Sequence, residues 1–315
     1  MRGFWRGASL AMLAGLALSL VACGQFGKLQ AKRAIKDAHA QYRLQDYRKA
    51  SKLYEEAIAQ DPELSVAYFY LANSYDNMYK PARKGEKEND EYLTKAIENY
   101  KKAAEKETDP KQRKLDLEFL VAAYGADKMN DPSQALPIVE KMIEIDPQDT
   151  SSYFQLFKIH EDAGEYDKAE AVLLRAKEVR PNDPLVYLQL GGFYNRQEEF
   201  GKTIEALTQR AVIEPNNPEA YYTIATYYWD KASRDFRLKE AEKKDYVAKG
   251  MTAIDKALQL KPDYMEAIAY KGLLLRIEVT FEKDPARHAA KLKEAERLQA
   301  EAEALRKKKV SGLTK

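Results

Sequence analysis

A repeat length of 34 residues is the feature that most constrains how this chain folds. Pro147, Pro181 and Pro215 follow one another at that interval. Between them, apolar residues recur three and four positions apart, which is the spacing of one face of an α-helix. Because proline cannot continue a helix, each proline ends a unit. The pattern therefore predicts an array of helix–turn–helix units.

The residues within each unit resemble the tetratricopeptide repeat. The clearest unit carries Tyr153, Leu156, Phe157, His160, Gly164, Tyr166, Ala169, Leu173, Ala176 and Pro181. Small residues such as Gly191 stand where two helices would cross closely. The resemblance covers about residues 31–280 and implies an all-α fold. It would be a right-handed superhelical solenoid of about seven helix–turn–helix repeats.

Two of the expected units, at about 65–108 and 218–262, are longer than the others. The surplus residues fall at the turn between the paired helices and carry charges of both signs. Split evenly, each surplus would lengthen both of its helices by about six residues, or roughly 9 Å. This charge pattern favours solvated helix extensions. The alternative is a pair of projections that touch a partner.

The C-terminal residues predict a long capping helix over 281–309. Asp284 suits the N-cap and Pro285 the first turn. A narrow apolar stripe from Leu292 to Leu305 would cover the last repeat, while the other faces stay charged. Residues 310–315 are expected to form a disordered tail.

The N-terminal residues predict an export signal over 1–22. Two arginines precede an apolar stretch of about fifteen residues, shorter than the roughly 20 that span a bilayer. Its end, Leu20-Val21-Ala22-Cys23, resembles a bacterial lipobox, in which the leader is removed and the cysteine receives a lipid. The resemblance makes Cys23 the lipid attachment site and residues 23–30 a short tether. The alternatives are an uncleaved signal anchor and an ordinary secretory leader.

The lipobox resemblance also implies a location, the bacterial cell envelope, with membrane contact through the N-terminal lipid. In enterobacterial lipoproteins an Asp after the cysteine retains the protein at the inner membrane. This chain has Gly24 there. We therefore expect a lipid-anchored protein on the periplasmic face of the outer membrane.

The charge balance argues against a nucleic-acid partner. The chain has 52 Lys and Arg against 50 Asp and Glu, and two of those arginines lie within residues 1–22. The mature chain is then neutral and lacks the basic surface that nucleic acids require. A hydrophobic content of 45% still allows a large core.

No motif in the sequence predicts catalysis. His39, His160 and His288 lie far apart and share no metal-ligand spacing. Phe200-Gly201-Lys202-Thr203 imitates the end of a phosphate-binding loop, but Arg196 stands where that loop needs its first glycine. We therefore expect no enzyme activity, no cofactor, no metal site and no small-molecule substrate.

The repeat resemblance also implies which residues would meet a ligand. In tetratricopeptide proteins, four positions of the first helix of each unit face a concave groove. Those positions here are Phe69, Asn73, Phe154, Lys158, Leu188, Asn195, Tyr222, Thr226 and Trp229. Aromatic anchors beside amides and a lysine suit an extended peptide or a partner helix. The alternative is that some of these residues pack against the next repeat.

The carboxylate clamp of chaperone-binding relatives is not reproduced, because Phe69 and Phe154 occupy places where a clamp needs a cation. A ligand held by its C-terminal carboxylate is therefore not expected. The sequence predicts a non-enzymatic protein–protein interaction scaffold in the envelope. It would help to assemble a secretion, pilus or outer-membrane complex. The alternatives are a periplasmic chaperone-like adaptor for exported chains and an accessory subunit of a cell-wall or lipid-processing enzyme.

Overall fold

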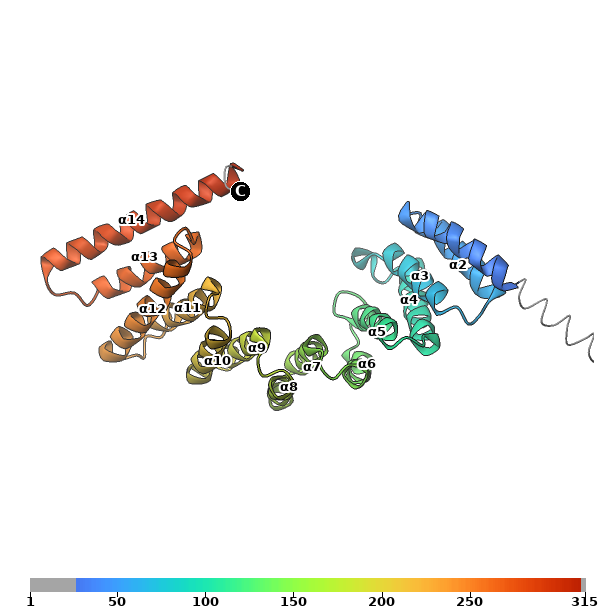
Figure 1. The fold of residues 1–315 in the computed structure, drawn as a ribbon, viewed down its shortest axis with the longest axis horizontal. Helices are drawn as coiled ribbons and strands as arrows, with labels where there is room; N and C mark the ends of the chain where they lie inside the picture. The colour runs from blue at the N-terminus through green and yellow to red at the C-terminus, as the bar shows by residue number, and fades with distance from the viewer. Residues whose placement is uncertain (1–26, 313–315) are drawn as a thin grey trace, which may run out of the picture. The chain divides into compact units, whose positions relative to one another are not determined.

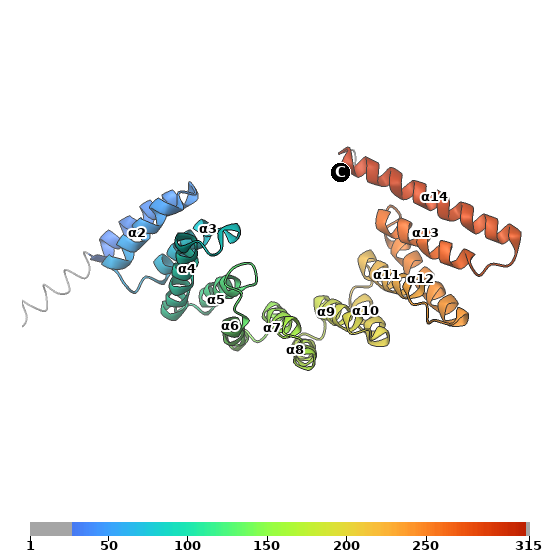
Figure 2. The same ribbon diagram turned by 180° about the vertical axis from the view of Figure 1, so that it is seen from behind.

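A computed structural model describes residues 27–312 of the chain, and these residues are almost entirely helical (Figures 1 and 2). The all-α fold expected from the sequence is confirmed. The predicted leader at 1–22, the lipid site Cys23 and the last residues of the predicted tail, 313–315, lie outside the described residues.

The described chain forms two compact units, residues 27–165 and residues 166–312. In unit 1, helical residues 27–43 are followed by α2 (Tyr47–Gln60), α3 (Ser65–Met78), α4 (Lys87–Lys106), α5 (Pro110–Tyr124), α6 (Pro132–Ile145) and α7 (Thr150–Asp162). Unit 2 contains α8 (Tyr166–Val179), α9 (Pro184–Arg196), α10 (Phe200–Ile213), α11 (Pro218–Arg234), α12 (Glu240–Leu260), α13 (Met265–Val279) and α14 (Pro285–Val310). From α2 onward, consecutive helices within each unit pack against one another.

Aspartate or asparagine caps followed by proline fix where many of the helices begin. The Asp183 side chain accepts a hydrogen bond from the Leu185 backbone N–H, and Pro184 is the first helical residue of α9. Asn217 and Pro218 repeat this arrangement at α11. The cap provides a hydrogen-bond acceptor for an N–H group that has no partner within its helix. Proline at the first helical position has no N–H group and therefore needs no acceptor.

The repeat prolines also serve as hydrogen-bond acceptors. In three successive repeats, the tyrosine at the fourth position of a helix donates its hydroxyl to the carbonyl of the proline six residues earlier. The three pairs are Tyr153 with Pro147 at 3.1 Å, Tyr187 with Pro181 at 2.9 Å and Tyr221 with Pro215 at 3.2 Å. Each bond ties the start of a helix to the end of the preceding repeat.

The two insertions differ from each other, and an even split between paired helices is wrong for the first. There α3 keeps an ordinary 14 residues, because Pro81 follows in a short 3₁₀ turn (Pro81–Arg83), and α4 alone extends, to 20 residues. In the second insertion both helices lengthen, α11 to 17 residues and α12 to 21.

The N-terminal helix begins earlier than the sequence predicts, because residues 27–30 of the expected tether are already helical. Gly27 lies against the end of α2, where a Cβ atom would come within 3.0 Å of the Gln60 carbonyl oxygen. At the other end, the helix expected over 281–309 is α14. The Asp284 carboxylate caps it by accepting from the Arg287 N–H at 2.8 Å.

Glycine allows a close approach of the helices in two pairs. In α9, a Cβ atom on Gly191 would lie 2.9 Å from both Cγ and Cδ2 of Leu207 in α10. Leu207 is completely buried, so its side chain has no space to move into. Between α13 and α14, a Cβ atom on Gly272 would lie 3.2 Å from the Ala295 carbonyl oxygen. A side chain larger than hydrogen at either position would push the two helices of that pair apart.

Gly191→Ala is expected to destabilise the fold, because the new methyl group overlaps Leu207. The matched control is Gly201→Ala in α10, where a Cβ atom would meet nothing within 4 Å. Gly201 lies in the first turn of α10, where the gain in helix propensity is smaller than at Gly191. A Gly191→Ala variant that is nevertheless less stable than the control, by about 2 kcal/mol, therefore reports the overlap. Chemical denaturation measures it. Equal free energies of unfolding would contradict the close crossing.

Candidate functional site

Unit 1 contains a groove of about 600 Å³ between α5 and α7. Its lining is mainly apolar. The residues come from the end of α5 (Val121, Ala122, Tyr124), the following loop and the start of α6 (Gly125, Ala126, Asn130, Pro132, Ala135), α7 (Phe154, Gln155, Lys158, Ile159, Asp162) and the residue after it (Ala163). We call it the α5–α7 groove.

A lysine in α5 fixes the start of α7. Lys114 Nζ lies 2.8 Å from a carboxylate oxygen of Asp149, the N-cap of α7, and 3.3 Å from one of Asp146. Burial raises the pKa of Asp149, but hydrogen bonds from Lys114, Ser151 and Ser152 outweigh it and hold that pKa well below its usual range. The Asp149 carboxylate is therefore charged near neutral pH, and the two walls of the groove are held together.

The loop at the end of the groove is closed by its own backbone. The Asn130 N–H donates to the Gly125 carbonyl at 2.9 Å, and the Met129 N–H donates to Ala123 at 3.2 Å. Asn130 has a φ of 58°, a conformation that asparagine tolerates better than most residues. This wall of the groove is thus shaped before any ligand arrives.

Phe154 and Lys158, two of the predicted ligand residues, both line the α5–α7 groove. Phe154, Ile159 and Val121 are half-buried, so each still presents apolar surface to the groove. Lys158 is exposed and forms an ion pair with Asp162 one turn later. A ligand can therefore pack an apolar side chain on Phe154 and meet polar groups at the edge.

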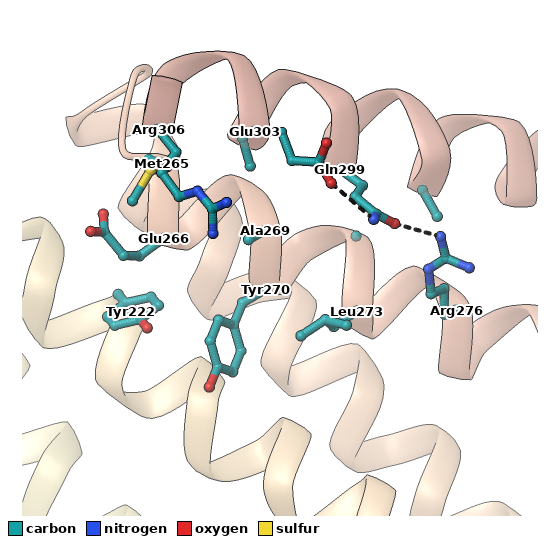
Figure 3. Close-up of a pocket in the computed structure, with 13 residues that line it drawn as sticks. Tyr222, Met265, Glu266, Ala269, Tyr270, Leu273, Arg276, Gln299, Glu303 and Arg306 are labelled. Carbon is teal, nitrogen blue, oxygen red and sulfur yellow. Dashed lines mark hydrogen bonds between the residues drawn. The ribbon is translucent and has the colours of Figure 1, made fainter. Parts of the chain in front are cut away.

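A second hollow, of about 390 Å³, lies between α13 and α14 in unit 2, and we call it the α13–α14 pocket (Figure 3). Its floor is largely apolar, and charged residues stand around its edge. Tyr222, Met265, Ala269, Tyr270, Gly272, Leu273, Ala295 and Ala302 form the floor, and Glu266, Arg276, Gln299, Glu303 and Arg306 form the edge. Gln299 accepts a hydrogen bond from Arg276 at 2.9 Å and donates one to Glu303 at 3.2 Å.

Tyr222 and Trp229 belong to one aromatic cluster. Both rings pack edge-on against Tyr270, at centroid distances of 5.4 Å and 5.2 Å. Burial raises the pKa of Tyr222 to about 12, so its phenol is neutral at physiological pH. Tyr222 lines the α13–α14 pocket, whereas Trp229 supports it through Tyr270.

Two of the predicted groove residues are buried, so the expectation that they face an open groove is wrong. Phe69 is only 8% exposed and packs edge-on against Phe119, with ring centroids 5.1 Å apart. The Asn73 side-chain oxygen accepts hydrogen bonds from Tyr42, at 2.7 Å, and from Asn77. Tyr42 and Phe119 come from other helices. Counting positions within a single repeat does not show that these large side chains cover Asn73 and Phe69.

The remaining three predicted residues have different surroundings. Leu188 packs against the core of unit 2, and the Thr226 hydroxyl donates to the Thr223 carbonyl of its own helix at 2.7 Å. Asn195 is exposed beside a separate polar hollow. The sequence reasoning missed Ile159 in α7 and the α13 side of the pocket. The same helical spacing, applied to the seventh unit from Met265, would have indicated Ala269 and Leu273.

The described residues offer no metal centre, because no three His, Cys, Asp or Glu side chains among them gather around one point. Within residues 27–312, no helix combines the length and apolar character needed to cross a bilayer.

Comparison with known proteins identifies the repeat. Residues 128–190, which include α7 and its groove residues Phe154 and Lys158, match the family model described as tetratricopeptide repeat. The match assigns the tetratricopeptide repeat to these residues. A crystal structure of the C-terminal part of a TPR repeat-containing protein from Cytophaga hutchinsonii is similar to this repeat protein, with a TM-score of 0.58 and 18% identity. The match covers 84% of this chain and 95% of that one.

Two other solved structures match with lower TM-scores. YrrB, described as a TPR protein with an unusual peptide-binding site, has a TM-score of 0.42 and 20% identity, covering 60% of this chain and 89% of that one. PilW, described as a widely conserved type IV pilus biogenesis factor, has a TM-score of 0.43 and 16% identity, covering 75% and 96%. No curated protein gave a significant sequence match. The family model therefore identifies residues 128–190, and the similar structures show the fold.

Proposed function

We propose that this repeat protein is a non-catalytic scaffold that binds an extended peptide segment of a partner protein in the α5–α7 groove. The observation that carries the proposal is the half-buried side chain of Phe154, which stands in an apolar groove with Lys158 beside it. Partly exposed aromatic side chains in preformed hollows are the usual anchors of protein interfaces. The volume of about 600 Å³ lies within the range of ligand-binding clefts.

The shape and rigidity of the groove favour a peptide. Its two walls are separate helices joined by the Lys114–Asp149 ion pair, and its end is closed by backbone hydrogen bonds. A preformed groove spares the ligand the entropy cost of ordering the protein. Gln155 and Lys158 add donors at the edge that can meet peptide carbonyls.

The envelope location belongs to the same proposal. The leader-like residues 1–22 and the lipobox-like run ending at Cys23 support a lipid-anchored scaffold on the periplasmic face of the outer membrane. There it would help to assemble a secretion, pilus or outer-membrane complex. This part of the proposal rests on the sequence resemblance alone.

Phe154→Ala is expected to weaken the binding of a peptide selected from a random library on the purified protein by tenfold or more. Truncation of a central aromatic anchor commonly costs more than about 1.4 kcal/mol, which is a factor of ten in affinity. The control is Val212→Ala in α10, which removes an exposed apolar side chain in unit 2. Titration calorimetry measures both. Unchanged affinity in the Phe154 variant would exclude the α5–α7 groove as the binding site.

The same selection separates the alternatives. A single dominant peptide motif supports a dedicated scaffold. A diffuse set of unrelated apolar peptides, all weakly bound, would instead favour the chaperone-like adaptor. A partner enzyme whose rate changes on binding would favour the accessory subunit.

Cys23→Ser is expected to leave a larger precursor that takes up no labelled palmitate in a bacterial host, because the thiol is the only cysteine sulfur in the chain. Gel mobility and label incorporation are the measurements, with the unaltered chain alongside. Normal labelling of the serine variant would contradict lipid attachment at this position.

A further inference from the structure

The N-terminal helix, residues 27–43, buries one face and leaves the other in water. Ala31 and Ala38 lie two turns apart on the inner face, and both are completely buried. A hydrogen bond of 2.7 Å joins the His39 ring to the Tyr54 hydroxyl of α2 and holds the helix against its neighbour. Most of the outward positions of this helix are exposed.

The exposed side of this helix is basic. It contains five exposed basic residues, whereas Asp37 is the one acidic residue of the helix. The chain from residue 23 onward is neutral overall, so this excess of one sign is local. We call the five residues the basic face, and they are Lys28, Lys32, Arg33, Lys36 and Arg43.

The spacing of the lysines does not stabilise the helix. Lys28, Lys32 and Lys36 follow one another at four-residue intervals, which places them on the same side of the helix. Like charges at this spacing repel one another and destabilise a helix. No residue of the basic face forms an ion pair with another described residue. A negatively charged partner outside the chain would relieve this repulsion.

The exposed side of α14 is different, because it mixes both signs. There Arg297 forms ion pairs with Glu294 at 2.8 Å and with Glu301 at 2.7 Å. The basic run from Arg306 to Lys309 follows at the end of α14, where cations interact favourably with the helix dipole. The charges of α14 are thus accounted for by the helix itself, and those of the basic face are not.

The basic face follows closely after the proposed lipid attachment site. Lys28 is five positions after Cys23, so their Cα atoms are at most about 18 Å apart. Lys36 lies roughly 12 Å further along the helix axis. A membrane that holds a lipid on Cys23 is therefore within reach of the basic face, whatever path the residues between them take. This step rests on the lipid anchor of the proposed function.

We propose that the basic face lies on the phosphate groups of an anionic lipid membrane and orients the N-terminal helix at the membrane surface. Several basic side chains together give measurable binding to such a surface, because their attractions add. Leu29 lies one turn before Arg33 and is 55% exposed, so it can enter the boundary between head groups and acyl chains. A lipid on Cys23 would hold the basic face at a high effective concentration near the head groups.

The test is co-sedimentation with vesicles that mix phosphatidylglycerol with phosphatidylcholine, beside vesicles of phosphatidylcholine alone. The protein starts at residue 23 and carries Cys23→Ser, so it holds every described residue and no lipid. It should bind the anionic vesicles and not the neutral ones. Binding should weaken as the salt concentration rises from about 0.1 M to about 0.5 M, because salt screens the attraction over a shorter distance.

The variant Lys28→Gln/Lys32→Gln/Lys36→Gln should weaken binding to the anionic vesicles by about a hundredfold, since each basic residue at such a surface contributes a factor of about five. Thermal unfolding checks that this variant folds. Because the substitutions remove like-charge repulsion, it should be at least as stable as the unaltered protein.

The matched control removes the same number of charges from other helices of unit 1. Lys52, Lys87 and Lys111 are exposed and lie in α2, α4 and α5. The variant Lys52→Gln/Lys87→Gln/Lys111→Gln has the same net charge as the first variant. It should bind the anionic vesicles as the unaltered protein does.

Three outcomes would overturn the proposal. The first is an unaltered protein that shows no preference for the anionic vesicles. The second is binding that is unchanged when Lys28, Lys32 and Lys36 are replaced. The third is binding that is lost instead when the lysines at 307–309 are replaced by glutamine, which would assign the membrane contact to the end of α14.

This test can fail separately from the proposed function. The protein used carries no lipid, so a negative result leaves the palmitate labelling of Cys23 to decide lipid attachment. The three lysines do not line the α5–α7 groove. Their replacement should therefore leave the affinity for a selected peptide unchanged.

Discussion

The close crossing of paired helices is the constraint on which the rest of the structure depends. A helix of about fourteen residues cannot bury enough surface alone, so each must pack against its neighbours. Gly191 permits this by leaving room for the completely buried Leu207. In unit 1, α5 and α7 leave apolar surface uncovered between them, and that surface is the α5–α7 groove. The buried core and the exposed groove therefore both result from how neighbouring helices pack.

Polar groups at helix ends convert this packing into a defined site. Asp149 caps α7 and at the same time pairs with Lys114 of α5, so one carboxylate orients one helix and joins it to another. In the next repeats the Tyr187 and Tyr221 hydroxyls donate to proline carbonyls at the end of the preceding repeat. A groove built this way is ordered before its ligand arrives, which lowers the entropy cost of binding.

The sequence predicted the repeat, because proline spacing and helical periodicity are local signals. It also placed Phe154 and Lys158 among the residues facing a groove, and both line the α5–α7 groove. It could not predict that Phe69 is covered by Phe119, because the covering residue comes from another repeat fifty positions away. The sequence does show Pro81 in the first insertion. Dividing the extra residues evenly between α3 and α4 took no account of this proline. Contacts between repeats therefore decide which face of a helix remains exposed to solvent.

Hydrogen exchange of the protein, with and without a peptide selected on it, tests the central claim most directly. A ligand in the α5–α7 groove should slow exchange at the end of α5, in the loop 125–131 and along α7, and leave α9 to α14 nearly unchanged. Protection confined to α11 through α14, with α5 and α7 unaffected, would show that the peptide binds elsewhere and that the α5–α7 groove is not the functional site.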